Sequence, residues 1–344
     1  MSVLTTDPTT AADVPDRAGL SEAALTACVR AAIAAPSLHN SQPWRFRIRD
    51  GGIDVYADWR RRVEVVDPSG RELLISVGAA VLNLRVAMAH QGRVPVLQPW
   101  PDPAEPDLVA HVAPGRPAPP TDALTALAEA IPRRHTNRRP FAELTVPASV
   151  VEELTWAADM EGARLRVADP PSRAAILSLV HTAGAHLRAH GIYPAELDER
   201  RPGTHRRRPR PGLPPQAFGP WDALEALPLR DFGLTQPKLH RGTDPFQPYP
   251  TLVVLSTDGD TRDHWLRAGQ SLERLLLMAT VRGLAATPTS RPLEVPALRK
   301  LLSDAAAGWW PQVVLRLGYC QPTTSTRRRP LAEVLLPAPT GAGS

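Results

Sequence analysis

The chain has 344 residues, of which 43% are hydrophobic, so it can bury the core of one large domain or of two ordinary ones. The formal net charge is +5 and the pI is about 9.7, but nearly all the positive charge is arginine and it is spread along the whole chain. No basic stripe is interleaved with aromatic residues, which argues against a nucleic-acid partner.

Cysteine and histidine positions argue against a metal site. Cys28 and Cys320 lie far apart and have no Cys or His neighbour at metal-ligand spacing, so we expect buried or half-buried thiols. His186 and His190 are four residues apart on a predicted helix, but the glutamate of the H-E-x-x-H zinc motif is missing.

Two further segments bear on localisation. Residues 1–20 carry three aspartates and no basic region before an apolar run, so we expect a flexible tail and not a signal peptide. No apolar stretch approaches the ~20 residues that a membrane span needs. We therefore expect a cytoplasmic protein that does not bind a membrane.

Hydrophobic periodicity and helix-breaking residues predict the secondary structure. In chain order we expect a helix over 21–35, a loop and strand over 35–48, a strand over 53–57, a helix over 71–91, a strand over 108–112, helices over 122–131 and 147–159, a strand over 164–167, a helix over 172–190, a strand over 251–256, helices over 263–282 and 295–302, a strand over 312–317 and a basic-to-apolar segment over 327–336. Residues 192–248 have no sustained period and are rich in Pro, Arg and Gly, so they form a separate insert.

Two of the predicted helices resemble each other. Residues 76–92 (SVGAAVLNLRVAMAHQG) align without a gap with residues 267–283 (RAGQSLERLLLMATVRG), and Gly78 coincides with Gly269. Each helix is preceded by a predicted strand. A duplicated unit buries its shared face against its twin, so we expect two halves packed as a pseudo-symmetric pair.

Two polar motifs are candidates for chemistry, because the chain has no G-x-G-x-x-G, P-loop or G-x-S-x-G motif. The first motif is PSLHNSQPW, residues 36–44. Ser37, Asn40 and Gln42 offer donors and acceptors on a tight loop, which suits the polar edge of a planar heterocycle. The alternative is a capped loop that binds no ligand.

The second motif is RRHTNRRPF, residues 133–141. Four arginines beside hydroxyl and amide side chains can form forked hydrogen bonds with a phosphate dianion. The alternative is a solvated basic turn. Residues 327–329, three consecutive arginines, are open to the same two interpretations.

These motifs resemble those of one enzyme family. Residues 35–46 (APSLHNSQPWRF) resemble the segment after the first helix in the nitroreductase superfamily of FMN enzymes, and residues 133–141 resemble that family's Arg-Arg-Ser-x-Arg-x-Phe motif. Residues 283–288 (GLAATP) resemble the turn after its central helix. Residues 312–319, followed by 327–330, resemble its last strand and phosphate-binding arginine. The resemblance covers most of residues 21–337 outside the insert.

The resemblance implies FMN as cofactor and NAD(P)H as reductant. Counting back from Phe141 places Asn137 at the family's serine and Arg139 at the following basic position. The family's leading arginine pair then falls on His135 and Thr136, unless the turn is shifted so that Arg133 and Arg134 serve as that pair. Arg134, Arg139 and Arg328 are the phosphate candidates, with hydrogen bonds from His135 and Asn137, and the backbone N–H groups of Thr289 and Ser290 would serve flavin N5. The candidate cofactor-binding residues are Ser37, Asn40, Gln42, Arg134, His135, Asn137, Arg139, Thr287, Pro288, Thr289, Ser290 and Arg328, with no side-chain catalytic acid and no metal ligand.

The distribution of the motifs resembles the Acg-like branch of the family, in which two nitroreductase-like halves are fused in one chain. This implies an α+β nitroreductase-like fold that forms an intramolecular pseudo-dimer, as a monomer or as a further homodimer. The expected parts are a tail over 1–20, a first half over 21–120, a second half over 121–337 with a lid-like insert over 192–248, and a tail over 338–344.

One FMN per chain is expected, because neither motif is repeated in the other half. Where the second half should repeat PSLHNSQPW it reads DMEGA, residues 159–163, and residues 93–99 (RVPVLQP) hold no basic turn.

Two functions follow from the resemblance. The first is an FMN-dependent NAD(P)H oxidoreductase that passes hydride through flavin N5 to a nitroaromatic, a quinone or another small acceptor. The alternative is an FMN-sequestering protein of the Acg type, in which the insert covers the flavin and turnover is low.

Overall fold

The computed structural model of the chain describes residues 19–189, 220–222, 243–303, 308–323 and 325–337. Within these residues the longer helices are α1 (Glu22–Ile33), α2 (Arg71–His90), α3 (Asp122–Ala130), α4 (Ala148–Asp159), α5 (Pro170–Ala189), α7 (Arg262–Val281) and α9 (Pro296–Leu302). The short helical turns are η1 (Leu38–Asn40), η2 (Trp59–Arg61), α8 (Arg291–Glu294) and α10 (Leu331–Val334).

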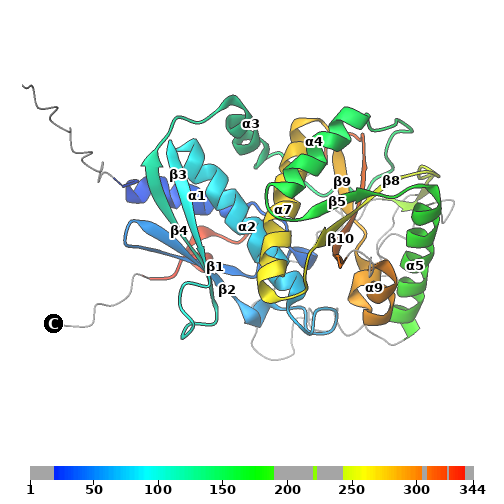
Figure 1. Ribbon diagram of the computed structural model, residues 1–344, viewed down its shortest axis with the longest axis horizontal. Coiled ribbons are helices and arrows are strands. Elements are labelled where there is room, and N and C mark those ends of the chain that lie inside the picture. The colour runs from blue at the N-terminus through cyan, green and yellow to red at the C-terminus, as the bar shows by residue number, and fades with distance from the viewer. Residues whose placement is uncertain (1–18, 190–219, 223–242, 304–307, 324, 338–344) are drawn as a thin grey trace, which may run out of the picture.

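The fold is α+β and contains two four-stranded sheets (Figure 1). The first has the order β1-β2-β4-β3, and the second has the order β5-β8-β10-β9, with every neighbouring pair antiparallel. The strands are β1 (Trp44–Arg49), β2 (Gly52–Ala57), β3 (Arg93–Pro99), β4 (Leu108–Pro117), β5 (Arg164–Val167), β8 (Thr251–Thr257), β9 (Ala285–Pro288) and β10 (Trp310–Gly318), with the two-residue strands β6 (Trp221–Asp222) and β7 (Thr243–Asp244) pairing separately.

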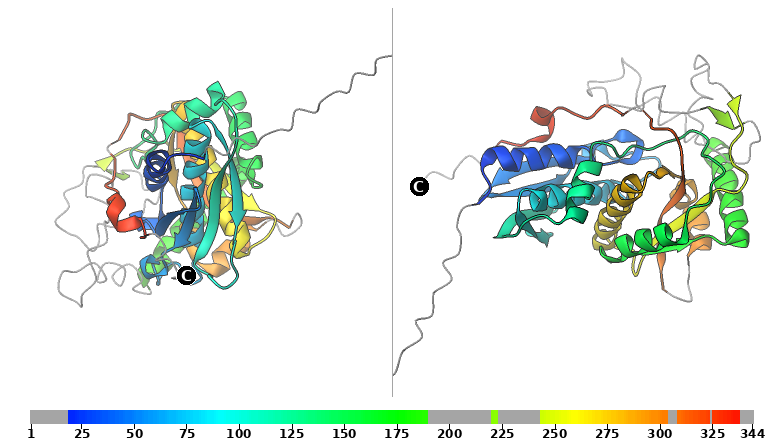
Figure 2. Two further views of the ribbon diagram at one scale, coloured as in Figure 1. Left: turned by 90° about the vertical axis from the view of Figure 1, so that its left-hand side faces the viewer. Right: turned by 90° about the horizontal axis from the view of Figure 1, so that it is seen from above.

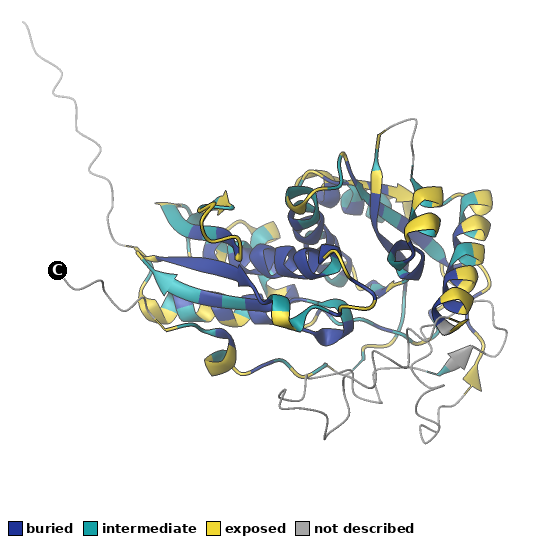
Figure 3. Cartoon of the chain, turned by 90° about the horizontal axis from the view of Figure 1, so that it is seen from below, coloured by how far each residue is buried: buried dark blue, intermediate teal, exposed yellow. Residues whose placement is uncertain are grey.

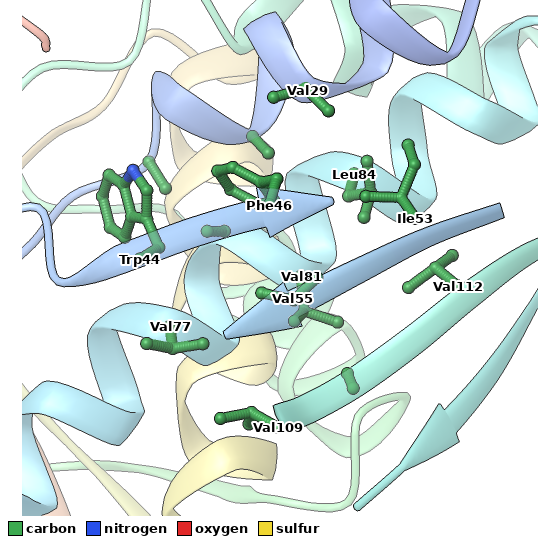
Figure 4. Packing of buried hydrophobic residues seen from close by; sticks show 14 of the residues in the cluster. Val29, Trp44, Phe46, Ile53, Val55, Val77, Val81, Leu84, Val109 and Val112 are labelled. Carbon is green, nitrogen blue, oxygen red and sulfur yellow. The ribbon is translucent and has the colours of Figure 1, made fainter. Parts of the chain in front are cut away.

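The first sheet packs one face against α1 and α2. Trp44 and Phe46 of β1 and Ile53 and Val55 of β2 are fully buried there, together with Val81 and neighbouring residues of α2 (Figure 4). Alternate residues of β1 lie on opposite faces, as the period of a half-buried strand requires. Burial of these aromatic and branched side chains stabilises this half of the molecule.

The second sheet is covered on both faces. Leu165, Leu255 and Leu315 face α4 and α7, whereas Leu252 and Val314 face α5 and α8. Because both faces are buried, β10 has almost no exposed residue after Trp310. The apolar run that the sequence shows over residues 312–317 therefore reflects a central strand with two covered faces.

The two sheets are joined through α2 and α7, which pack against each other at the centre of the molecule (Figures 1 and 3). A Cβ atom added at Gly78 would lie 2.2 Å from the Leu266 carbonyl oxygen, and one added at Gly269 would lie 2.0 Å from the Ile75 carbonyl oxygen. The backbones thus touch where the two aligned glycines meet, which leaves no room for any other residue.

α2 also corrects one expectation from the sequence. The mean hydropathy of α2 is 1.6 over an 18-residue stretch, so by length and composition this helix could span a membrane. From the sequence we expected no apolar stretch of that length. In this fold 78% of that stretch is buried inside the protein. The buried central helix of a compact domain has the same composition, so the apolar stretch is explained by the core.

The C-terminal segment returns from the second sheet to the first half (Figure 2). After β10 the chain runs back to α10, which contacts α1 and β1. Phe46 forms a parallel bridge with Leu335, and the N–H of Leu336 donates to the Phe46 carbonyl at 2.7 Å. Val334 is fully buried in the core of the first half. The chain end therefore ties the two halves together.

Most predicted helices and strands lie close to their expected positions, but β3 and β9 were not predicted. Both are edge strands, and both contain proline. Proline removes a backbone donor and weakens the strand pattern, yet it is tolerated where only one side of a strand is paired. The insert over 192–248 lies outside the described residues, except for 220–222 and 243–248.

The glycine contact makes a testable prediction. We expect Gly78→Ala to lower the free energy of unfolding by about 1–3 kcal/mol, because the new methyl group would press on backbone atoms that cannot rotate away. Urea unfolding measures the change. Gly19→Ala is the matched control, since nothing lies within 4 Å of its added Cβ. Equal midpoints for the two variants would show that the helices separate without cost.

Candidate functional site

A cavity of about 150 Å³ lies between the two halves. Its walls come from the loop before β1, from α2 and α7, from the turn after α3, and from β9, α8 and β10. The lining residues include Ser37, Leu38, His39, Glu72, Ser76, Ala79, Thr136, Arg138, Leu272, Thr287, Pro288, Thr289, Ser290, Arg291, Glu294 and Arg316. A cavity built from both halves can form only when the two halves pack together.

The loop between α1 and β1 is held in a strained conformation. His39, Asn40 and Gln42 have φ values of 51°, 56° and 49°, in the left-handed region that costs non-glycine residues about 1–3 kcal/mol each. The Ser37 Oγ accepts the Gln42 N–H at 2.9 Å, and the Ser76 Oγ accepts the Leu38 N–H at 3.2 Å. These bonds fix the loop against α2, so that Ser37 and His39 line the cavity.

Asn40 and Gln42 do not line the cavity but hold the C-terminal segment. The Asn40 Nδ2 donates to the Arg327 carbonyl at 3.0 Å, and the Gln42 Oε1 accepts the Arg329 N–H at 2.7 Å. Arg329 in turn donates from Nη1 to the Gln42 carbonyl at 3.1 Å. The polar side chains of this motif are therefore divided, with Ser37 at the cavity and the two amides at the joint between loop and chain end.

In the basic turn after α3, successive side chains lie alternately at the cavity and away from it. Thr136 and Arg138 line the cavity, whereas Asn137 is buried and donates from Nδ2 to the Gln321 carbonyl at 2.8 Å. The Asn137 Oδ1 accepts the Arg139 N–H at 3.0 Å, and Arg139 is exposed. Neither Asn137 nor Arg139 faces the cavity in this structure. The alternation follows from the extended backbone that pairs Thr136 with Ala286 of β9.

All four residues of the 287–290 turn line the cavity. The Thr289 N–H donates to the Val314 carbonyl at 2.8 Å, so that amide is engaged within the sheet and is not available to a ligand in this structure. This corrects the expectation that it serves flavin N5. The Ser290 Oγ accepts the Val314 N–H at 3.4 Å.

Arg316 of β10 is a cavity residue that the sequence did not single out. It is 1% exposed, and its guanidinium lies 3.8 Å from the ring centre of Phe141 and 5.2 Å from that of Phe246. Its Nη2 donates to the Arg139 carbonyl at 2.8 Å and to the Thr287 Oγ1 at 3.1 Å. A lone arginine within an apolar strand was the available signal, because burial of such a residue calls for a specific partner.

Arg134, which is buried, and Arg328, which is half-buried, form a basic pair that is not part of the cavity lining. Their Nη2 groups donate to the same acceptor, the Ala34 carbonyl at the end of α1, at 3.2 Å and 3.1 Å. The Arg328 Nη1 also donates to the Asn40 Oδ1 at 3.1 Å. Among the described residues the buried Arg328 Nε has no hydrogen-bond partner. The pair can therefore offer further donors to an anion.

Burial and mutual repulsion perturb the protonation of this cluster. Burial lowers the pKa of Arg328 to about 10, and the charge of Arg134 adds to the effect. Burial also lowers the pKa of His135, which the charges of Arg134 and Arg328 depress further. His135 is therefore expected to be neutral at pH 7, which leaves the two arginines as the cationic groups.

Related proteins are found by sequence. No family model matches the chain. Rv3131 of Mycobacterium tuberculosis, named as a candidate NAD(P)H nitroreductase, is 32% identical over 319 residues, or 88% of each chain. The acg protein of the same organism, named in the same way, is 32% identical over 327 residues, or 90% of this chain and 94% of its own.

Among solved structures, the FMN-dependent nitroreductase NfnB of Mycobacterium smegmatis, determined with NADPH, is 16% identical. The match covers 65% of this chain and all of NfnB, with a TM-score of 0.38. The family assignment rests on the curated relatives, which are more than 30% identical and match over nearly their whole length. On this ground the chain belongs to the nitroreductase superfamily, together with proteins named as candidate NAD(P)H nitroreductases.

Proposed function

We propose that the protein binds one FMN and acts as an NAD(P)H-dependent oxidoreductase on a nitroaromatic, a quinone or another small electron acceptor. The observation that supports this most is the cavity between the halves, which is lined by the strained Ser37–His39 loop, by Thr136 and Arg138, and by the 287–290 turn. These are segments that resemble the FMN-binding motifs of the family to which the chain belongs.

We infer that the chain is an intramolecular pseudo-dimer of two nitroreductase-like halves. Each half places a four-stranded antiparallel sheet beside a 20-residue helix, and the aligned Gly78 and Gly269 meet where α2 and α7 cross. In this arrangement each half supplies one wall of the cavity. The fusion would replace the partner subunit of an ordinary homodimer.

The chemistry of the donors suits FMN. Arg134 and Arg328 would hold the phosphate, because they are adjacent guanidinium groups with a buried Nε donor that lacks a partner among the described residues. Ser37, Thr136 and Arg138 would bind the polar parts of the cofactor from the cavity wall.

When bound, FMN would supply the transfer of hydride between a nicotinamide and an electron acceptor. The protein would contribute position and charge. Arg316, whose guanidinium lies over two aromatic rings, places a fixed positive charge at the cavity, where it would stabilise negative charge that develops during reduction. Because the Phe141 and Phe246 rings and Thr287 already orient this group, it needs little rearrangement in the reaction.

The alignment of α2 with α7 relates the cavity beside α2 to an equivalent position beside α7, and side chains fill that second position. The counterparts of the small residues Ser76 and Ala79 are Arg267 and Gln270. Gln270 accepts a hydrogen bond from the Arg85 Nη1 at 2.8 Å, and the same nitrogen donates to Glu161 at 2.5 Å. Glu161 belongs to the segment that stands where a second PSLHNSQPW loop would lie, and it also pairs with Arg274. This polar network supports one flavin per chain.

The rival function, FMN storage, rests on the insert over 192–248. The resemblance implies that this segment is a lid, and it lies outside the described residues apart from 220–222 and 243–248. The two functions share the same binding site and differ only in whether reductant and acceptor reach it. Turnover therefore distinguishes them, whereas binding does not.

The filled position beside α7 predicts what happens when a residue of α2 at the cavity is replaced by its counterpart from α7. We expect Ala79→Gln to weaken FMN binding at least ~100-fold, because it introduces into the cavity the side chain that fills the related position. Flavin released from the purified protein by heat is quantified by its absorbance.

The matched control is Gln270→Ala, which should leave one FMN per chain because Arg267 and Glu161 still occupy the related position. Circular dichroism checks that both variants fold. Two FMN per wild-type chain, or full loading of Ala79→Gln, would contradict the assignment of the cavity.

A second prediction concerns turnover. If the protein is an oxidoreductase, NADH or NADPH should bleach the bound flavin, and a quinone or a nitroaromatic should restore its colour over many cycles. Stopped-flow absorbance measures both half-reactions. Flavin that is reduced by dithionite but not by either nicotinamide would favour the storage function instead.

A further inference from the structure

Among the described residues, the fully buried Glu273 is an acidic group beside the basic pair that the proposed function does not use. It lies on α7, is 0% exposed, and its Oε1 is 3.4 Å from the Arg134 Nε. Neither of its oxygens has a hydrogen-bond partner among the described residues. An ionised carboxylate in such surroundings is costly, because burial removes water without supplying full compensation.

The charged and polar groups around Glu273 come from several helices and loops. Arg134 follows α3, Arg328 lies on the C-terminal segment, and Asn83 faces it from α2. His135 stands beside the two arginines, which depress its pKa after burial does. The Ala34 carbonyl at the end of α1 receives donors from both guanidinium groups. Glu273 is thus the counter-charge for two adjacent cations.

Asn83 of α2 lies beside Glu273 and has one buried polar atom without a hydrogen-bond partner among the described residues. The Asn83 Nδ2 donates to the Ala31 carbonyl at 3.2 Å, while the Asn83 Oδ1 is buried and has no partner among the described residues. A carboxylate can only accept hydrogen bonds, whereas a protonated Glu273 carries an O–H that can also donate one. Burial raises the pKa of Glu273 to about 7, although Arg134 and then Asn83 oppose that shift.

We propose that Glu273 takes up a proton when the phosphate of FMN binds to Arg134 and Arg328, so that cofactor retention depends on the protonation of this buried carboxyl. The inference rests on the proposed function, because it assumes that this pair holds the phosphate. In the empty site an ionised Glu273 compensates one arginine. In the loaded site the phosphate, which carries a charge of about −1.5 to −2, compensates the charges of both arginines. An ionised Glu273 would then repel the phosphate.

The direction of the pH dependence follows from this exchange. A nearby anion favours the protonated form of Glu273, so the protonated protein binds FMN more tightly. Affinity should therefore be constant just below the pKa of the free site and should fall as the pH rises above about 7. Free FMN carries its second phosphate charge above about pH 6, so the ligand itself no longer titrates in this range.

The test is the dissociation constant of FMN for the full-length protein between about pH 7 and about pH 9, measured by quenching of flavin fluorescence. We expect affinity to fall by up to about tenfold per pH unit for the wild type. Glu273→Gln should remove the slope and keep tight binding at the alkaline end. The matched control is Glu161→Gln, a carboxyl in the other arginine network, which should keep the wild-type slope.

Calorimetry of the unaltered protein provides a measurement that does not depend on a variant folding. FMN titrated at about pH 8 in two buffers of different ionisation enthalpy should show uptake of up to about one proton per flavin bound. Binding with no proton uptake and no slope would overturn this inference and leave the proposed function standing. Failure to bind FMN at any pH would overturn the proposed function itself.

A purely structural role for Glu273 gives a different result. Because its pKa is raised above the unfolded value, the protein should lose stability as the pH rises from about 4.5 to about 7, with or without FMN. A pH-dependent stability combined with a pH-independent FMN affinity would therefore also overturn the inference.

Discussion

The close contact of α2 with α7 is the constraint on which the remaining structure depends. At Gly78 and Gly269 the two backbones touch, so the helices are already as close as their backbones allow. Each helix carries one sheet, and the contact thereby sets the distance between the two sheets. The candidate site lies in the space that this distance leaves, and its walls are precise only because the central pair is rigid.

The same two helices account for the difference between the two sides of the molecule. On one side the helix surface bears the small residues Ser76 and Ala79, and a cavity remains. On the related side it bears Arg267 and Gln270, and an arginine–glutamate network fills the space. In the proposed pseudo-dimer the two sides can diverge in this way, since each copy of a repeated helix mutates independently, whereas a symmetric homodimer must carry every change twice.

Placement of the site also depends on the end of the chain. Asn40 and Gln42 bind the backbone of residues 327–329, and Leu335 pairs with Phe46. These contacts hold the strained loop in position and bring Arg328 beside Arg134. The loop, the basic turn and the C-terminal arginines, which are far apart in sequence, thus share one buried polar cluster.

Residue patterns along the chain predicted most of the local structure. Period and helix-stop signals located the long helices, and the ungapped match of 76–92 with 267–283 paired the two that meet at the centre. The motif resemblance identified the family, which the relatives of similar length confirm. It also selected Ser37 and residues 287–290, which line the cavity.

Tertiary structure alone decided which polar side chains face the cavity. Counting back from Phe141 pointed to Asn137 and Arg139, yet the extended turn directs Thr136 and Arg138 inward and uses Asn137 to hold the Gln321 carbonyl. Arg316, Glu273 and Asn83 carry no motif, because each acts through neighbours that come from other helices and strands. A sequence determines the period of a segment and the chemistry of each residue. The direction of a polar side chain is settled only by the partners that packing brings within hydrogen-bonding distance, since a buried polar group must find one of them.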